Sequence, residues 1–375
     1  MKTHKMGERN EEIMKFRKTI GVVGLACLLL FQLFGCGVPG RTPEASEPVG
    51  NDDDIIKEIV TESPDTRATN PLTGLPMETG SEEDRPIAIM LNNIRVALPQ
   101  FGVSKADQIY EVCAEGGITR MLAVFQSLDG VGDLGSVRST RLYYLDLAQG
   151  LDAILVHAGG SEEAYSTIQS RGMFTLDGVR GAHTSELFWR DQTRIRSAGY
   201  EHSLFTSGEK LQALFPSLSV RKTHESGYTY PMAFSDDGTP NDGATAKKIS
   251  VVFSNYKTGV FEYDESSGLY KVSEYGKPYV DGETDEQVCV KNVLVLYTGI
   301  SNLPGDTSGR LRVQLTGSGT GIYACNGKVS AITWSKAGPD SPFQYAYEDG
   351  TPVEFGRGVS YINIVKDGQA SVSND

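Results

Sequence analysis

Side chains that could bind or react concentrate in the first half of the chain, between residues 115 and 202. The candidates are Glu115, Arg120, Arg138, Ser139, Arg141, His157, Ser161, Arg190 and His202. Arginine guanidinium groups bind carboxylate or phosphate oxygens through paired hydrogen bonds. Many of these residues fall at the ends of predicted strands and helices, where open α/β sheets bind their ligands. The pattern predicts an Arg- and His-lined site for an anionic ligand.

Two pairs of arginines have helical spacing. The pairs are Arg138 with Arg141, and Arg190 with Arg194. The sequence predicts helices over residues 138–150 and 185–198, and each helix would place its pair on one face. A single arginine at such a spacing is also an ordinary partner for a surface carboxylate. The hypothesis of a site therefore depends on the group rather than on any one member.

The segment His157-Ala-Gly-Gly-Ser161 follows a predicted strand and begins a predicted helix. Backbone N–H groups beside the two glycines could bind an anion at the helix N-terminus. A strand-to-helix joint also needs glycine for its geometry alone, and serine is a common N-cap. His157 could act as a general base or simply end the strand. The segment matches neither a Walker loop nor a Gly-x-Ser-x-Gly elbow.

Cysteine usage indicates neither a metal site nor a disulfide framework. Cys113, Cys289 and Cys325 are widely spaced and odd in number, and the chain has no CxxC, HExxH or EF-hand pattern. We expect no metal and no cofactor. Cys113 lies in an alternating segment and is predicted to be a small buried hydrophobe. Cys289 and Cys325 could pair if their strands are neighbours, which spacing cannot decide.

The elements that must position these residues change in type along the chain. Residues 85–225 mix strand and helix patterns, with short apolar runs over 85–93 and 151–157 and an alternating strand pattern over 117–128. Residues 226–375 contain many short strands separated by turns such as Asn326-Gly327, which is typical of antiparallel hairpins. We therefore expect an α/β (mixed-sheet) N-terminal domain, which carries the ligand site, and a β-rich C-terminal domain.

The N-terminus has the pattern of a lipoprotein signal peptide. Basic residues precede an apolar run over residues 20–34, which ends at Gly35-Cys36. The run is short for a membrane-spanning helix. We expect residues 1–36 to be the signal, Cys36 to be lipidated, and the protein to lie on the outer face of the cytoplasmic membrane. An uncleaved anchor is the alternative, and translation could start at Met1 or at Met14.

Residues 37–84 are predicted to be a disordered acidic tether. This stretch has twelve acidic and three basic residues, several prolines and few aliphatic side chains, so it buries too little apolar surface to fold. The whole chain has a formal net charge of -13, and the body after the tether is also acidic. This charge argues against nucleic acid as a partner. Recognition of an anion must come from a local basic cluster.

Several motifs, in a fixed order, resemble the YerB-like lipoproteins of Gram-positive bacteria. They include Asn70-Pro-Leu-Thr-Gly74, Glu115-Gly-Gly-Ile-Thr-Arg120, Gly135-Ser-Val-Arg-Ser-Thr-Arg141, His157-Ala-Gly-Gly-Ser161, Phe188-Trp-Arg190 and Tyr275-Gly-Lys-Pro-Tyr-Val-Asp281. The resemblance implies a surface lipoprotein of two domains and supplies no catalytic residues. Glu201-His202-Ser203 departs from it, since a proline is expected before the histidine and an asparagine after it.

Two functional classes follow from these observations. The first is a membrane-anchored binding or assembly protein, whose Arg/His-lined site takes an anionic envelope polymer or a small anion and whose β-rich domain contacts an envelope protein. The second is a hydrolase or transferase for an envelope phosphodiester, glycan or ester, with Glu115 or His157 as the base and arginines stabilising negative charge. A scaffold without a site would require the arginines to scatter into separate surface ion pairs.

Overall fold

The structure is a computed structural model that describes residues 67–240 and 242–374. The predicted signal over residues 1–36, the lipidation site Cys36 and most of the predicted tether lie outside these residues. The described residues belong to one compact unit. In this part of the chain no helix is both long enough and apolar enough to cross a membrane.

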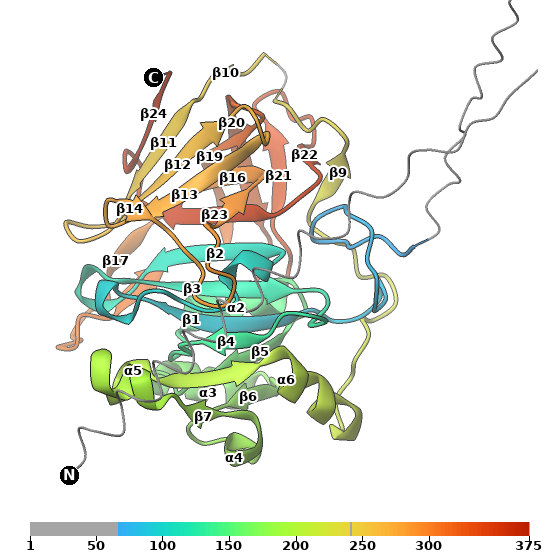
Figure 1. The fold of residues 1–375 in the computed structure, drawn as a ribbon. Coiled ribbons are helices and arrows are strands. Elements are labelled where there is room, and N and C mark those ends of the chain that lie inside the picture. Colours follow the sequence, from blue (N-terminus) through green and yellow to red (C-terminus); the bar gives the residue numbers. More distant parts are fainter. Residues whose placement is uncertain (1–66, 241, 375) are drawn as a thin grey trace, which may run out of the picture. The chain divides into compact units, whose positions relative to one another are not determined.

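A central sheet of eleven strands runs through both halves of the chain (Figure 1). Its order is β10 (Ala244–Thr245), β20 (Lys328–Lys336), β19 (Gly317–Cys325), β16 (Asn292–Tyr297), β23 (Ser360–Val365), β2 (Gln108–Cys113), β3 (Thr119–Phe125), β1 (Ile87–Asn93), β5 (Ile154–His157) and β6 (Thr175–Asp177), with β21 (Gln344–Tyr347) paired to β20. The halves meet where β2 runs parallel to β23, with Ile109 opposite Tyr361. The sheet contains both parallel and antiparallel pairs.

Alternating side chains of the central strands enter two separate cores. In β1, Ile87, Ile89 and Leu91 point to one face of the sheet, and Ala88 and Met90 point to the other. Both sets are buried. Because a sheet that is covered on both faces has no polar side, its strands read as continuous apolar runs in the sequence.

Smaller sheets and short helices cover the two faces of the central sheet. A six-stranded sheet contains β14 (Lys277–Pro278), β13 (Leu269–Glu274), β12 (Thr258–Asp264), β11 (Lys248–Val252), β24 (Ala370–Ser373) and β15 (Cys289–Val290). The remaining sheets are β4 (Asp133–Gly135) with β8 (Leu204–Ser207) and β7 (Trp189–Arg190), β17 (Ile300–Asn302) with β18 (Leu311–Val313), and β22 (Glu354–Gly356) with β9 (Ala233–Ser235). The helices are α2 (Leu142–Gly150), α3 (Glu162–Ser170), α4 (Thr184–Leu187), α5 (Gln192–Ser197) and α6 (Gly208–Leu214). Strands of the six-stranded sheet share one core with β1, and α2 shares the other.

The expected fold class is confirmed, because the first half is a mixed sheet with helices and the second half is rich in strands. The Asn326-Gly327 turn joins β19 and β20, with Cys325 opposite Lys328. Both turn residues have positive φ, at 50° and 70°. This is the geometry that a two-residue hairpin of this type requires.

Both predicted arginine-bearing helices were wrong in extent. Helix α2 begins only at Leu142, and residues 137–140 are extended, with bridges from Val137 to Leu91 and from Thr140 to Gly160. The predicted helix 185–198 is two helices, α4 and α5, separated by strand β7. Tertiary pairing with β8 overrides the local helical pattern there.

The predicted tether was too long at its C-terminal end. Residues 67–84 pack on the body: Leu72 is fully buried, and Asn70 donates to the carboxylate of Asp107 at 2.8 Å. Buried apolar side chains, Leu72 and Met77, and a few polar contacts order a segment whose average composition predicts disorder. Cys289 and Cys325, whose pairing the sequence left open, are both free thiols.

Candidate functional site

The candidate site lies beyond the C-terminal ends of two parallel strands, β1 and β5. The extended segment 137–140 is inserted between them: the N–H of Arg138 donates to the Met90 carbonyl, and the Arg138 carbonyl accepts from the N–H of Ala158. These bonds fix the backbone from which Arg138 projects. Helix α2 follows, and Arg141 is its N-cap residue.

Glu115 is the carboxylate that two of the arginines share. It lies in a short 3-10 helix (Glu115–Gly117) between β2 and β3. The Nη2 atom of Arg141 donates to Glu115 Oε2 at 3.0 Å, and Arg141 Nε also pairs with Oε1. The Nη2 atom of Arg120, in β3, lies 3.4 Å from Glu115 Oε2. The loop, the strand and the helix start thus converge on one carboxylate.

Arg120 is buried and has hydrogen-bond donors that lack a partner in the described part of the chain. Its side chain is 5% exposed, and its Nε and Nη1 atoms have no hydrogen-bond partner among the described residues. Burial lowers the pKa of Arg120, and the positive charge of Arg141 lowers it further, while Glu115 opposes both. An unsatisfied buried donor costs roughly 1–3 kcal/mol. Arg120 therefore has hydrogen-bond donors without partners in the described chain, in addition to its ion pair with Glu115.

Arg138 and His202 are the remaining predicted residues of the cluster. Arg138 Nη1 donates to the Glu201 carbonyl at 2.8 Å, and Nη2 pairs with the Glu201 carboxylate. The His202 ring accepts at Nδ1 from the Asn92 amide at 2.8 Å. Burial lowers the pKa of His202, and the charge of Arg138 adds to the effect. Both effects favour the neutral form of the His202 ring.

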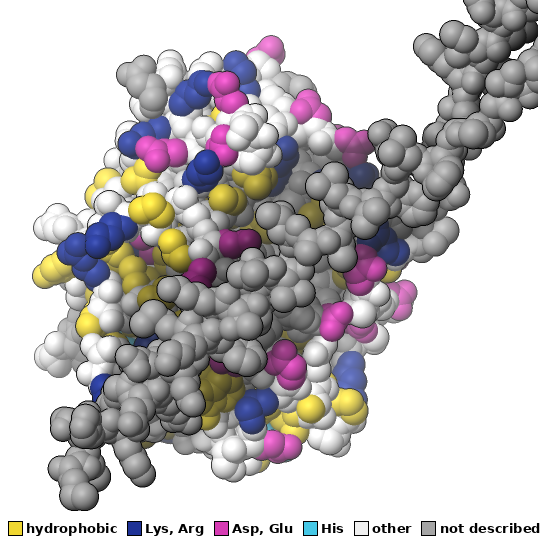
Figure 2. All heavy atoms as spheres, viewed as in Figure 1, with side chains coloured by type: hydrophobic (Ala, Val, Ile, Leu, Met, Phe, Trp, Pro, Cys, Tyr) yellow, Lys and Arg dark blue, Asp and Glu magenta, His cyan; other side chains and the backbone are white. Residues whose placement is uncertain are grey.

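The three arginines act on one another electrostatically. The charges of Arg138 and Arg141 both lower the pKa of Arg120. Two carboxylates, Glu115 and Glu201, face these three cations, so the cluster has a local excess of positive charge. On the face shown in Figure 2, by contrast, basic and acidic side chains are interspersed over the six-stranded sheet.

The structure does not bring every predicted residue into this cluster. The His157 ring is fully buried and bonds to the Gly159 carbonyl at 2.8 Å and to Thr175 Oγ1 at 3.1 Å. Ser161 is the N-cap of α3 and accepts from Ala164 N–H. Ser139 donates to the Ala158 carbonyl at 2.9 Å. These three residues hold the strand ends in place.

Arg190 has a supporting position rather than a place beside the other arginines. It lies in β7, stacks over the Tyr200 ring at 3.8 Å and donates to the Tyr200 carbonyl at 2.6 Å. It therefore braces the short helix Tyr200–His202, which carries Glu201 and His202. Its helical spacing to Arg194 has no role, because Arg194 is in α5 and donates to the carbonyls of Ala97 and Pro99.

Neither residue proposed as a general base is suited to that role. Burial opposes ionisation of Glu115, but the hydrogen bond from Arg141 and the charge of Arg120 outweigh it, so the pKa of Glu115 is lowered. A carboxylate with a lowered pKa is a weak base. The His157 side chain has no exposed surface and faces Asp177 and Thr175. The geometry favours binding of an anion over proton transfer.

Two members of the cluster, Asn92 and Glu201, were absent from the sequence-based candidates. Asn92 is opposite Arg120 in the register of β1 and β3 and is 1% exposed. A polar residue at the end of an otherwise apolar strand is the signal that could have identified it. Glu201 could have been noted from its place beside His202. Its bond to Arg138 spans 63 residues and is not visible in the sequence.

Comparisons with known proteins give one consistent result. Residues 72–221 match the family described as "Protein of unknown function (DUF3048) N-terminal domain", and residues 249–362 match its C-terminal domain. The chain is 31% identical to "Putative lipoprotein YerB" of Bacillus subtilis (strain 168) over 309 residues, which are 81% of this chain and 88% of that protein. It also resembles the crystal structure of the YerB protein from Bacillus subtilis, with a TM-score of 0.70 and 29% identity, covering 82% of this chain and 100% of that one. The chain belongs to the YerB-like DUF3048 family.

Proposed function

We propose that this protein is a lipoprotein of the cell envelope that binds an anionic envelope component through Arg120, Arg138 and Arg141. The observation that carries the proposal is the buried Arg120 guanidinium, two of whose nitrogen atoms have no hydrogen-bond partner among the described residues. A phosphate or carboxylate oxygen is the complementary group for such donors. The lowered pKa of Glu115 and the burial of His157 support binding rather than hydrolysis or group transfer.

The anchor follows from the N-terminal sequence together with the name of the relative. The apolar run before Gly35-Cys36 has the form of a lipoprotein signal, and the relative is called a lipoprotein. A diacylated cysteine carries enough acyl chain for stable attachment to a bilayer. We expect Cys36→Ala to move the protein from the membrane fraction to the soluble fraction of the cell. Unchanged fractionation and unchanged electrophoretic mobility would contradict the anchor.

The binding site is tested by titration of the folded body with glycerol 3-phosphate in a calorimeter. Arg138→Ala should weaken binding by roughly 2–5 kcal/mol, because a desolvated ion pair loses one partner. Arg138→Lys should restore binding only in part, since lysine keeps the charge and loses the planar fork. Arg357→Ala is the matched control, because Arg357 pairs with the exposed Asp236 far from the cluster in sequence.

Two results would overturn the proposal. One is an absence of binding to wild-type protein by glycerol 3-phosphate, pyrophosphate and a uronic acid alike. The other is an equal loss of affinity in Arg138→Ala and Arg357→Ala, which would indicate unspecific attraction. Far-ultraviolet circular dichroism of each variant separates loss of a binding contact from loss of the fold.

A further inference from the structure

A hollow lies near the N-terminal ends of the parallel strands β1 and β5. It has a volume of about 610 Å³, within the usual range of small-molecule sites. Arg85 precedes β1 and Asp152 precedes β5, so the hollow is near the strand starts, whereas the arginine cluster follows the strand ends. Its lining includes Arg171, Phe174 and Tyr228. An adjoining hollow of about 520 Å³ shares the segment Glu225 to Tyr228.

The charges that line this hollow are balanced, unlike those of the arginine cluster. Arg221 donates to both carboxylate oxygens of Asp152 at 2.6 Å, and Arg85 Nε is 3.2 Å from the same carboxylate. Arg171 is paired with Asp146 at 2.6 Å. Each of these arginines therefore already has a carboxylate partner. The hollow offers no unmatched cation to an anionic ligand.

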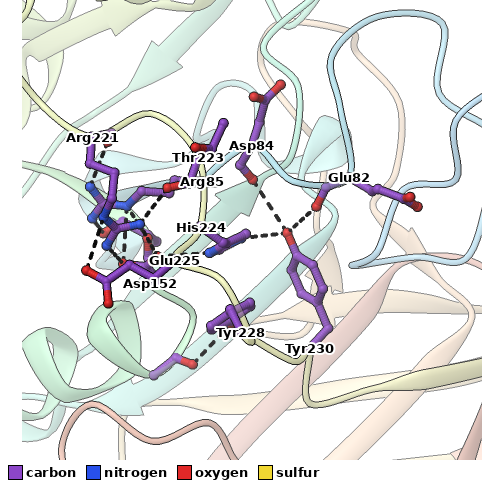
Figure 3. Close-up of polar contacts among 12 residues, drawn as sticks. Glu82, Asp84, Arg85, Asp152, Arg221, Thr223, His224, Glu225, Tyr228 and Tyr230 are labelled. Atoms are coloured by element: carbon purple, nitrogen blue, oxygen red, sulfur yellow. Dashed lines mark hydrogen bonds and ion pairs between the residues drawn. The ribbon is translucent and has the colours of Figure 1, made fainter.

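A chain of polar contacts fixes an aromatic group at the edge of the hollow (Figure 3). His224 Nδ1 is 2.9 Å from Asp152 Oδ2, and His224 Nε2 is 2.6 Å from the Tyr230 hydroxyl. The Tyr230 hydroxyl donates to the Glu82 carbonyl at 2.8 Å. The imidazole is thus bound at both ring nitrogens. Its plane is set before any ligand arrives.

The fixed imidazole in turn orients Tyr228. The two rings are stacked, with centroids 3.9 Å apart and an angle of 6° between their planes. The Tyr230 ring is perpendicular to both, at 5.1 Å. Tyr228 lines both hollows although one face of its ring is covered by His224. A side chain held in this way loses little conformational entropy when a ligand packs on it.

We propose that this cavity binds a neutral saccharide unit. A pyranose ring presents C–H bonds to a single aromatic face, while hydroxyl groups around its rim both donate and accept hydrogen bonds. The cavity supplies the matching groups: the Tyr228 ring with Phe174 and Met173 for the apolar face, and planar Arg, Asp and Gln side chains for the hydroxyls. A nucleobase would favour enclosure between two aromatic rings. Here the Tyr228 ring offers a ligand only one face, because His224 covers the other.

Asp152 is suited to holding the wall of the cavity in place rather than to donating a proton. Burial opposes its ionisation, but the hydrogen bonds from His224 and Arg221 prevail and hold the pKa of Asp152 well below its usual range. A glycosidase acid needs a raised pKa so that it is protonated near neutral pH. Asp152 is instead a permanent carboxylate that organises the arginines and the imidazole.

The test is a titration of the folded wild-type body with an oligosaccharide of N-acetylglucosamine, followed by amide chemical shifts. We expect shifts at Met173, Phe174 and Tyr228. Tyr228→Ala should weaken binding by about tenfold or more, because the aromatic face on which the saccharide packs is lost. Tyr228→Phe should bind nearly as well, since the hydroxyl makes only a long 3.4 Å contact to the Gly150 carbonyl. Tyr256→Ala, at a tyrosine that is 72% exposed, is the matched control.

The outcomes separate this site from the arginine cluster. Arg138→Ala should bind the oligosaccharide with unchanged affinity. A negative result at one site therefore does not affect the proposal for the other site. Wild-type shifts remain informative even if Tyr228→Ala does not fold. The proposal is overturned if millimolar oligosaccharide produces no shifts, if the shifts occur around Arg120 instead, or if adenosine binds the cavity and the saccharide does not.

Discussion

The Glu201 carboxylate is paired with Arg138, and under the proposed function an anionic ligand would have to displace it. The Glu201 side chain is 69% exposed, whereas Arg138 is 13% exposed, so the glutamate is the partner that can leave. We expect Glu201→Gln to bind glycerol 3-phosphate up to about fivefold more tightly, because an exposed ion pair contributes roughly 0.2–1 kcal/mol. Calorimetry beside Glu354→Gln, an exposed glutamate in β22, checks this. Weaker binding in Glu201→Gln would show that Glu201 helps to hold the ligand.

His157 should make the protein less stable in mild acid. Its pKa is lowered by burial, so the folded state resists a protonation that the unfolded chain accepts. The contribution of neutral His157 to the free energy of unfolding is fully present above the ordinary histidine pKa of about 6.5, and it is lost as the pH falls below that value. Between about pH 7.5 and about pH 5, the urea midpoint of His157→Gln should fall less than that of wild type. Equal falls would place the pH dependence in other groups.

At the scale of residues, the arginines could be predicted and their geometry could not. Arg120, Arg138 and Arg141 were selected because they lie near element ends. In the structure Arg120 and Arg141 share Glu115, and the charge of Arg138 also lowers the pKa of Arg120. The helical spacing that first linked Arg138 to Arg141 is irrelevant, because Arg138 is in an extended segment. Partners such as Glu201 were missed since hydrogen bonds across 63 residues leave no local pattern.

Among the elements, the β19–β20 hairpin gives the most direct test of how turn geometry and packing stabilise the second half. Gly327 has φ of +70°, and a Cβ atom there would lie 2.7 Å from the Tyr263 ring. Gly327→Ala should lower the free energy of unfolding by about 1–3 kcal/mol, from backbone strain and this contact together. Chemical denaturation measures the loss.

Gly276 provides a matched control for that hairpin. It also has positive φ, at +73°, but no atom lies within 4 Å of the position that its Cβ would take. Gly276→Ala should therefore cost only the backbone strain, about 1–2 kcal/mol. If the two substitutions prove equally costly, the Tyr263 contact relaxes freely and the hairpin is not constrained by packing.

Elements defined by turn chemistry were predictable, and elements defined by tertiary pairing were not. Asn-Gly specifies its hairpin through the dihedral angles of two residues. The pattern over 185–198 has helical periodicity, yet β7 interrupts it because Trp189 and Arg190 pair with β8. Similarly, Leu72 orders a segment of tether-like composition by entering a core that lies elsewhere in the chain.

At the scale of the whole molecule, the two halves form one sheet that no local pattern reveals. The β2–β23 pairing aligns five residues of each strand, and the Tyr361 hydroxyl donates to Glu111 at 2.6 Å across 250 residues. The sequence pattern indicates a strand in each of these two regions. It cannot identify their partners, since every buried strand of this kind has the same apolar character.

Because the sheet is continuous, we predict that both halves of the body unfold in a single transition. The chain has two tryptophans, Trp189 in the first half and Trp334 in the second, so Trp334→Phe and Trp189→Phe each leave one local fluorophore. In each variant, the urea midpoint by fluorescence should coincide with that by circular dichroism. Gly327→Ala should also lower the midpoint that Trp189 reports, although it lies in the other half. Separate midpoints would contradict this prediction, as would a Trp189 midpoint that Gly327→Ala does not change. Either result would mean that the β2–β23 pairing does not couple the two halves and that each half is an independent domain.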